Sequence, residues 1–176
     1  MQDALKKEAE RAGMTYTLIV NGPFLDWGIM VGFIMNLKGK SVTLFDGGDR
    51  VFSTTTLASI GKAVVGVLKN PAETKNRAVY VQDTASSLKK LAAMGKKATG
   101  EEGWKEEVIK IDDVLAQSWA ELQKESPKVE IFVYGFLKAA IWGEGYGSHF
   151  PKLDNELLGV KGLSDAEVQD VVSGYA

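Results

Sequence analysis

The sequence predicts an α/β protein with few parallel strands and a predominantly helical remainder. Two short, almost wholly apolar runs, Tyr16 to Val20 and Ala78 to Val81, are typical of strands buried on both faces of a parallel sheet. Most other segments repeat their apolar residues at helical spacing. The 176 residues contain no linker, internal repeat or low-complexity segment. We therefore expect residues 1–176 to form one domain, or a piece of one.

Composition narrows the class of protein. With 45% apolar and 25% charged residues and a net charge of −2, the chain reads as a soluble globular protein. The mixed charges give no reason to expect nucleic acid or an anionic membrane as partner. Cysteine is absent, which excludes disulfides and thiolate chemistry. Because we see no signal peptide and no apolar run long enough to span a membrane, we expect a cytoplasmic location.

The loop after the first strand is the first candidate site. Asn21 to Trp27 contains turn-forming residues, two aromatic residues and one acid. In open α/β sheets, ligands bind just beyond the carboxyl ends of strands. An ordinary connecting loop is the alternative interpretation.

The remaining elements follow from spacing and capping signals. Aromatic residues at helical spacing, including Trp119, Phe132 and Phe136, are expected in the core. Trp104 to Ile111 fits either an edge strand or an irregular crossing. Helices are expected over part of Phe24 to Asn36, over Thr84 to Ala98 and over Ile111 to Leu122. A short helix should end at Gly13, another should begin at Pro127, and a third should begin at the capping box of Ser164 and Glu167. One more helix is expected from the apolar stripe of Leu57, Ile60, Val64, Val67 and Leu68.

One acidic segment resembles a cation-binding loop only superficially. The short strand Val42 to Phe45 is followed by Asp46-Gly47-Gly48-Asp49. A calcium loop requires more oxygen ligands at set spacing, so a tight turn is the better interpretation. We expect no metal site.

Several segments carry a resemblance to a known family. Gly13 to Phe24, Gly-Met-Thr-Tyr-Thr-Leu-Ile-Val-Asn-Gly-Pro-Phe, resembles the segment after the central helix of NmrA-like and isoflavone-reductase-like proteins, which are atypical short-chain dehydrogenases. The likeness continues through Ser53 to Ala63, Glu73 to Arg77, Gly143 to Phe150 and Asn155 to Gly159. It maps onto the C-terminal half of the family, so it implies the C-terminal part of a Rossmann-like domain.

The resemblance also implies roles for individual residues. Asn21, Gly22, Pro23 and Phe24 match the family loop near the nicotinamide end of NADP or NAD, and are the expected cofactor contacts. The expected substrate contacts are Asp26, Trp27, Tyr146, His149 and Phe150. Core packing is an equal alternative for Trp27. A structural or solvated role is the alternative for His149, the only histidine.

Two parts of the family's machinery are missing. No G-x-G-x-x-G or G-x-x-G-x-x-G fingerprint is present, and the glycines of Gly143 to Gly147 follow a helix instead of a strand. The family's catalytic lysine falls near Gln2 or before Met1, and Lys6 and Lys7 do not match its position. Cofactor binding is therefore expected only where the missing N-terminal βαβ unit is present.

Three functional hypotheses remain open. The chain is the substrate-side part of an oxidoreductase that moves a hydride from NADPH to a small aromatic or unsaturated substrate. Alternatively, it belongs to a non-catalytic NAD(P)-sensing regulator that acts through protein partners, or it is a truncated fragment without its own activity. Because parallel strands need neighbours and cover, we expect exposed strand edges, and with them either a stability lower than the composition suggests or self-association through those edges.

Overall fold

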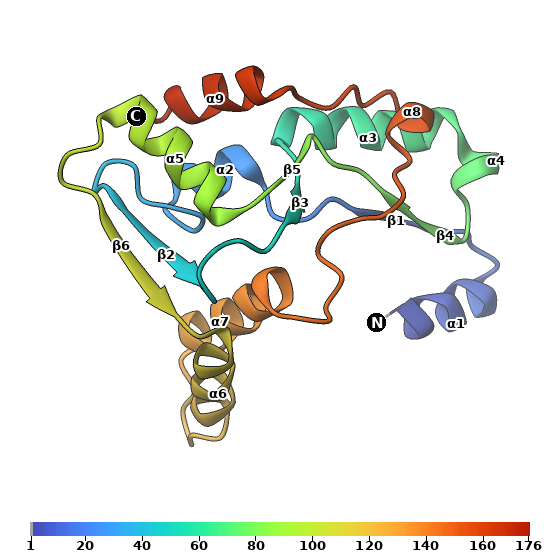
Figure 1. The fold of residues 1–176 in the computed structure, drawn as a ribbon. Coiled ribbons are helices and arrows are strands. Elements are labelled where there is room, and N and C mark those ends of the chain that lie inside the picture. Colours follow the sequence, from blue (N-terminus) through green and yellow to red (C-terminus); the bar gives the residue numbers. More distant parts are fainter. Residues whose placement is uncertain (1) are drawn as a thin grey trace.

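The computed structural model, which describes residues 2–176, confirms a mixed α/β fold with few strands and many helices (Figure 1). The strands are β1 (Thr17–Val20), β2 (Ser41–Phe45), β3 (Phe52–Thr54), β4 (Arg77–Tyr80), β5 (Thr84–Ser86) and β6 (Lys105–Ile109). The helices are α1 (Gln2–Ala12), α2 (Leu25–Met30), α3 (Leu57–Lys69), α4 (Pro71–Thr74), α5 (Leu88–Thr99), α6 (Ile111–Leu122), α7 (Val129–Trp142), α8 (Asn155–Leu158) and α9 (Asp165–Ser173).

The described strands pair as three two-stranded sheets. The two predicted strands pair in parallel as β1 and β4, with Thr17 opposite Arg77. β2 pairs in parallel with β6, which settles the undecided segment as a strand. β3 and β5 form a short antiparallel pair between these two sheets (Figure 1).

Burial of the first strand on both faces was predicted, and this was wrong. All four residues of β1 are only half-buried, and Tyr80 at the end of β4 is exposed. Within residues 2–176, β1 has β4 as its single neighbour, so its other edge lacks a paired strand. Self-association through this edge stays a prediction.

The main core is centred on Trp142 at the end of α7. Its ring stacks on Phe45 at a centroid distance of 5.0 Å and meets Phe52 edge-on at 5.8 Å. Such aromatic contacts add to the hydrophobic stabilisation of a buried cluster. They join α7 to β2 and β3. A second, smaller cluster under α3 contains Ala63, Val79, Val81, Leu158 and Val160.

One predicted helix agrees with the structure and another starts later than expected. Part of Phe24 to Asn36 is helical, as predicted, and α2 ends at Met30 before the chain turns at Gly32, where φ is +74°. The helix expected from Thr84 starts only at Leu88. Residues 84–86 pair with β3 instead, and the Ser87 side chain caps the helix.

The buried face of α3 also differs from the predicted stripe. Ser59, Ala63 and Gly66 are buried, whereas Val64 and Leu68 are 43% and 74% exposed. Small residues occupy the contact line because α8 approaches the helix backbone at Gly66.

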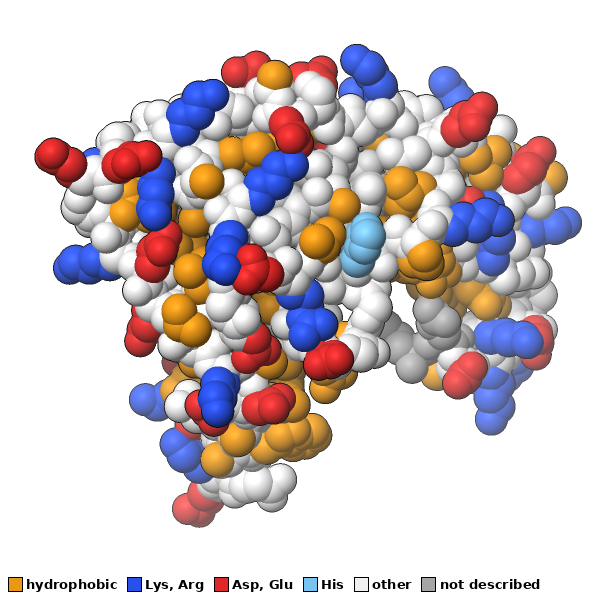
Figure 2. All heavy atoms as spheres, viewed as in Figure 1, with side chains coloured by type: hydrophobic (Ala, Val, Ile, Leu, Met, Phe, Trp, Pro, Cys, Tyr) orange, Lys and Arg blue, Asp and Glu red, His pale blue; other side chains and the backbone are white. Residues whose placement is uncertain are grey.

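The aromatic residues of the α6–α7 hairpin were expected in the core, and this was wrong. Trp119 is 54% exposed, while Phe132 and Phe136 are half-buried. The Phe136 ring packs against the other two, with its centroid 4.8 Å from that of Trp119 and 6.3 Å from that of Phe132. The hairpin projects from the body of the molecule, and apolar side chains are visible at its surface (Figures 1 and 2).

Local signals were the most reliable. The N–H of Gly48 donates to Phe45 O at 2.8 Å, which closes the predicted turn after β2. Ser164 and Glu167 form the predicted capping box of α9.

Within residues 2–176, no group of three or more acidic or histidine side chains is arranged to hold a metal ion.

Candidate functional site

The predicted cofactor loop, Asn21 to Phe24, is held against the buried end of β3 and the residue that follows it. Thr55 Oγ1 donates to Asn21 O, and Thr54 Oγ1 donates to Pro23 O, both at 2.7 Å. Both threonines are fully buried. Since buried hydrogen bonds are costly to break, the loop has a defined position instead of being free to move.

Three residues of this loop line a cavity of about 310 Å³, which we call the apolar pocket. Its lining carries no charged side chain, and Tyr134 supplies its one side-chain hydroxyl. Trp27 lies at its wall, where its ring meets that of Phe24 edge-on at 6.3 Å. The full lining is Gly22, Pro23, Phe24, Trp27, Gly28, Phe33, Tyr134, Leu137 and Ile141.

The opposite wall of the apolar pocket was not predicted. It consists of Phe33 and three residues of α7, namely Tyr134, Leu137 and Ile141. Their spacing of three, four and seven residues places them on one helix face, and this was the available signal. It was masked because α7 carries apolar residues on other faces as well.

The side chains of Asp26 and Asn21 form hydrogen bonds with neighbouring backbone groups. Asp26 is half-buried, and its carboxylate accepts from the N–H groups of Leu57 and Trp27 at 2.9 to 3.2 Å. A carboxylate at the first turn of α3 is favourable because of the helix dipole. The Asn21 side chain donates to Gly22 O at 2.7 Å. Neither residue lines the apolar pocket.

The other predicted substrate contacts lie on the segment before α8. His149 is exposed, and its pale blue side chain lies at the surface in Figure 2. Tyr146 is 56% exposed. Phe150 is buried against Tyr80 at a centroid distance of 5.3 Å, and its N–H donates to Ser53 Oγ at 2.9 Å. None of the three lines the apolar pocket. Their substrate role stays a prediction.

Asp154 anchors this segment to β4. Its carboxylate accepts from the Arg77 guanidinium and from the Tyr80 N–H, each at 2.9 Å. Burial alone would raise the pKa of the Asp154 carboxyl. The hydrogen bonds from Arg77 and Tyr80, with the charge of Arg77, outweigh burial and hold this pKa below its ordinary value.

Replacing Asp154 with asparagine is expected to lower the free energy of unfolding by about 1 kcal/mol at pH 7, since Arg77 remains partly exposed. The lowered pKa means that the ionised carboxyl stabilises the fold above the unfolded value of about 3.9, and this stabilisation is lost as the pH falls through the folded value. Urea unfolding between pH 7 and pH 3 should show the two proteins converging. Asp49→Asn, at an exposed pair with Lys89, should change stability much less, and a constant gap for Asp154→Asn would contradict this account.

Known protein structures include several whose fold is similar to that of this chain. Solved structures of similar fold are Rossmann-like, NmrA-like reductases and epimerases, in agreement with the predicted fold class and resemblance. It aligns with a structure of AtPrR2 with NADP⁺ and (+)pinoresinol, at a TM-score of 0.72 and 19% identity, over 99% of this chain and 56% of the other. It also aligns with the Citrobacter sp. triphenylmethane reductase complexed with NADP(H), at a TM-score of 0.65 and 11% identity, over 97% of this chain and 56% of the other.

Sequence comparison points to fungal relatives. The chain is 31% identical over 176 residues to oxidoreductase poxI of Penicillium oxalicum, covering 94% of this chain and 54% of that protein. The chain thus spans about half the length of the curated relatives it matches. No protein-family model matches it. Among residues 2–176, no helix has the length and apolar character needed to cross a membrane.

Proposed function

We propose that this chain is the substrate-side, C-terminal part of an NAD(P)-dependent oxidoreductase that transfers a hydride from NADPH to a small aromatic or unsaturated substrate. The observation that carries the proposal is the apolar pocket, whose one wall is the Gly22–Phe24 loop and whose other wall is α7. Hydride transfer needs the nicotinamide and the substrate in contact with water excluded, and an apolar cavity suits that requirement.

In this proposal, the present chain and the remaining part of the protein supply different parts of the active site. The loop and the apolar pocket supply the nicotinamide side and the substrate wall. The part not present here would supply the glycine-rich turn, where backbone N–H groups at a helix N-terminus bind the pyrophosphate, and the catalytic lysine. The half-buried β1, with its unpaired edge, is compatible with further strands beside it. The oxidoreductase relative and the NADP-bound structures of similar fold support this assignment.

A non-catalytic NAD(P)-sensing protein is the second candidate. The observation that favours it is the lining of the apolar pocket, in which Tyr134 is the one titratable side chain. A sensor needs a dinucleotide site but no general acid, whereas a reductase needs a proton donor near the substrate.

The test is a calorimetric titration with NADPH and NADP⁺. The chain alone, folded by circular dichroism, should not bind either nucleotide in the micromolar range, because it has no fingerprint glycines. A chimera that places the uncovered part of the Penicillium oxalicum relative before residues 1–176 should bind NADPH. Consumption of bound NADPH with aromatic enone substrates would support the oxidoreductase.

Other outcomes separate the alternatives. A chimera that binds NADPH without consuming it favours the sensor, and a folded chimera that does not bind favours the fragment hypothesis. Micromolar binding by the chain alone would overturn the account of the missing half.

A further inference from the structure

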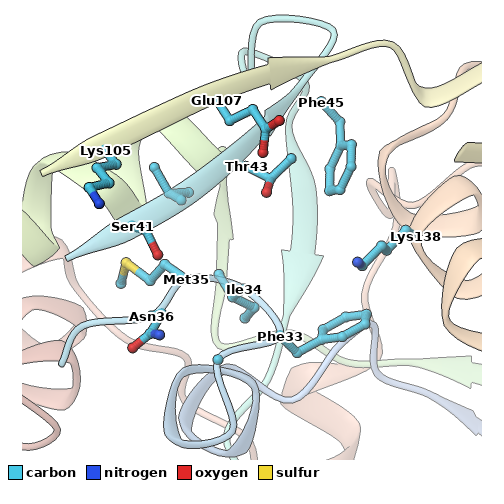
Figure 3. A pocket seen from close by; sticks show the side chains of 12 residues that line it. Phe33, Ile34, Met35, Asn36, Ser41, Thr43, Phe45, Lys105, Glu107 and Lys138 are labelled. Atoms are coloured by element: carbon cyan, nitrogen blue, oxygen red, sulfur yellow. The ribbon is translucent and has the colours of Figure 1, made fainter. Parts of the chain in front are cut away.

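A second cavity of about 290 Å³ lies between the turn after α2, the exposed face of the β2–β6 sheet, and α7. We call it the lysine pocket, and Phe33, Thr43, Phe45, Lys105, Glu107 and Lys138 are among its lining residues (Figure 3). Thr43 and Glu107 are paired across the two strands, so their side chains share one face of the sheet. The cavity therefore combines an aromatic wall with several polar groups, unlike the apolar pocket.

Lys138 is the distinctive group in the lysine pocket. It is half-buried on α7, and its Nζ lies 5.9 Å from the centroid of the Phe45 ring. In Figure 3 its side chain points into the space between Phe33 and Phe45. Among residues 2–176, no carboxylate forms a salt bridge with it. A partly desolvated ammonium without a carboxylate partner is a favourable place for an anion.

The lysine pocket adjoins the apolar pocket, since Phe33 lines both cavities. A third cavity, of about 380 Å³, is lined by Trp27 and Tyr134 from the apolar pocket side and by Lys138 from the other. The third cavity thus shares walls with both pockets, which offers a path for a ligand that extends from the apolar pocket toward Lys138.

The other charged side chains near Lys138 do not cancel the attraction of its ammonium for an anion. Glu107 and Lys105 lie on β6 and Glu130 on the first turn of α7, and all three side chains are exposed. Exposed charges are screened by water and salt, whereas the half-buried Lys138 lies against an aromatic ring and is screened less.

We propose that Lys138 selects ligands with an aromatic body and a carboxylate, the body filling the apolar pocket and the carboxylate binding the Lys138 ammonium. This inference rests on the proposed function in taking the apolar pocket as the substrate's place, and it adds the charge of the substrate.

The experiment uses two probes of the same shape, naphthalene-2-carboxylate and naphthalene-2-carboxamide, titrated calorimetrically into the 1–176 chain at low salt without cofactor. The carboxylate should bind about tenfold more tightly, since a charge-assisted hydrogen bond replaces a neutral one. Lys138→Met should remove this preference, and Lys138→Arg should retain it. Lys110→Met removes an exposed lysine outside the three cavities and should leave the preference unchanged.

Equal affinity for the two probes, or a preference that survives in Lys138→Met, would overturn the role of Lys138 and leave the apolar pocket as the substrate site. Absence of binding by both probes would overturn the proposal as well, because the adjoining cavities would then not accept an aromatic acid. If Lys138→Met fails to fold, Lys138→Gln, which removes the charge and keeps a polar side chain, takes its place in the same comparison. Nucleotide binding by the chimera tests the proposed function separately.

Discussion

Replacing Gly22 with alanine should lower the free energy of unfolding by about 3 to 4 kcal/mol. Gly22 has φ +64°, a left-handed conformation that an L side chain adopts only with strain. An added Cβ would also overlap the carbonyl oxygen of Ser53, which belongs to the buried β3 strand. The loop must then leave β3, and the hydrogen bonds from Thr54 and Thr55 weaken together.

Gly13→Ala is the matched control for this prediction. Gly13 has φ +65°, almost the same conformation, but an added Cβ would meet nothing within 4 Å. It should therefore cost only the conformational strain, about 1 kcal/mol. Urea denaturation of both variants separates strain from steric overlap. Equal losses would contradict the close approach of the loop to β3.

Gly66→Ala should have the second largest effect, a loss of about 2 to 3 kcal/mol. An alanine Cβ would lie 2.6 Å from Leu158 Cα and 2.8 Å from Leu158 C, at the contact between α3 and α8. Backbone atoms cannot rotate away as a flexible side chain can, so α8 must shift. Leu158 is only 2% exposed, and its burial beside Val79 and Ala63 would be disturbed.

Gly61→Ala on the same helix tests the same substitution without the contact. An added Cβ at Gly61 meets nothing within 4 Å. Alanine is the better helix former, so this variant should gain about 0.5 to 1 kcal/mol. The two substitutions should thus change the denaturation midpoint in opposite directions, and destabilisation of similar size in both would show that the α3–α8 contact is not close.

The features predicted correctly depend on a few neighbouring residues. The capping box of Ser164 and Glu167 and the turn after Phe45 each need only the chemistry of a short segment. The parallel pairing of β1 and β4 agrees with the two apolar runs, each typical of a strand in a parallel sheet. Likewise, the Gly22–Phe24 loop follows directly from the end of a predicted strand.

The pocket wall could not be predicted in the same way. α7 is apolar over most of its circumference, so its spacing did not tell which side meets the core, which side meets α6 and which side faces the loop. Trp119 on α6 was assigned to the core for the same reason, although it packs within a projecting hairpin. The position of Lys138 beside Phe45 likewise depends on bringing α7 against β2.

Local sequence was thus sufficient for β1, β2 and β4, the capping box of α9 and the loop after β1, because hydrogen bonds and backbone conformation between near neighbours specify them. The apolar pocket, the lysine pocket and the burial of each helix face emerged only in the folded chain. They depend on contacts between residues far apart in the sequence, such as Phe33 and Trp142, whose ring centroids lie 5.5 Å apart, and burial is a property of those contacts and not of the residues alone.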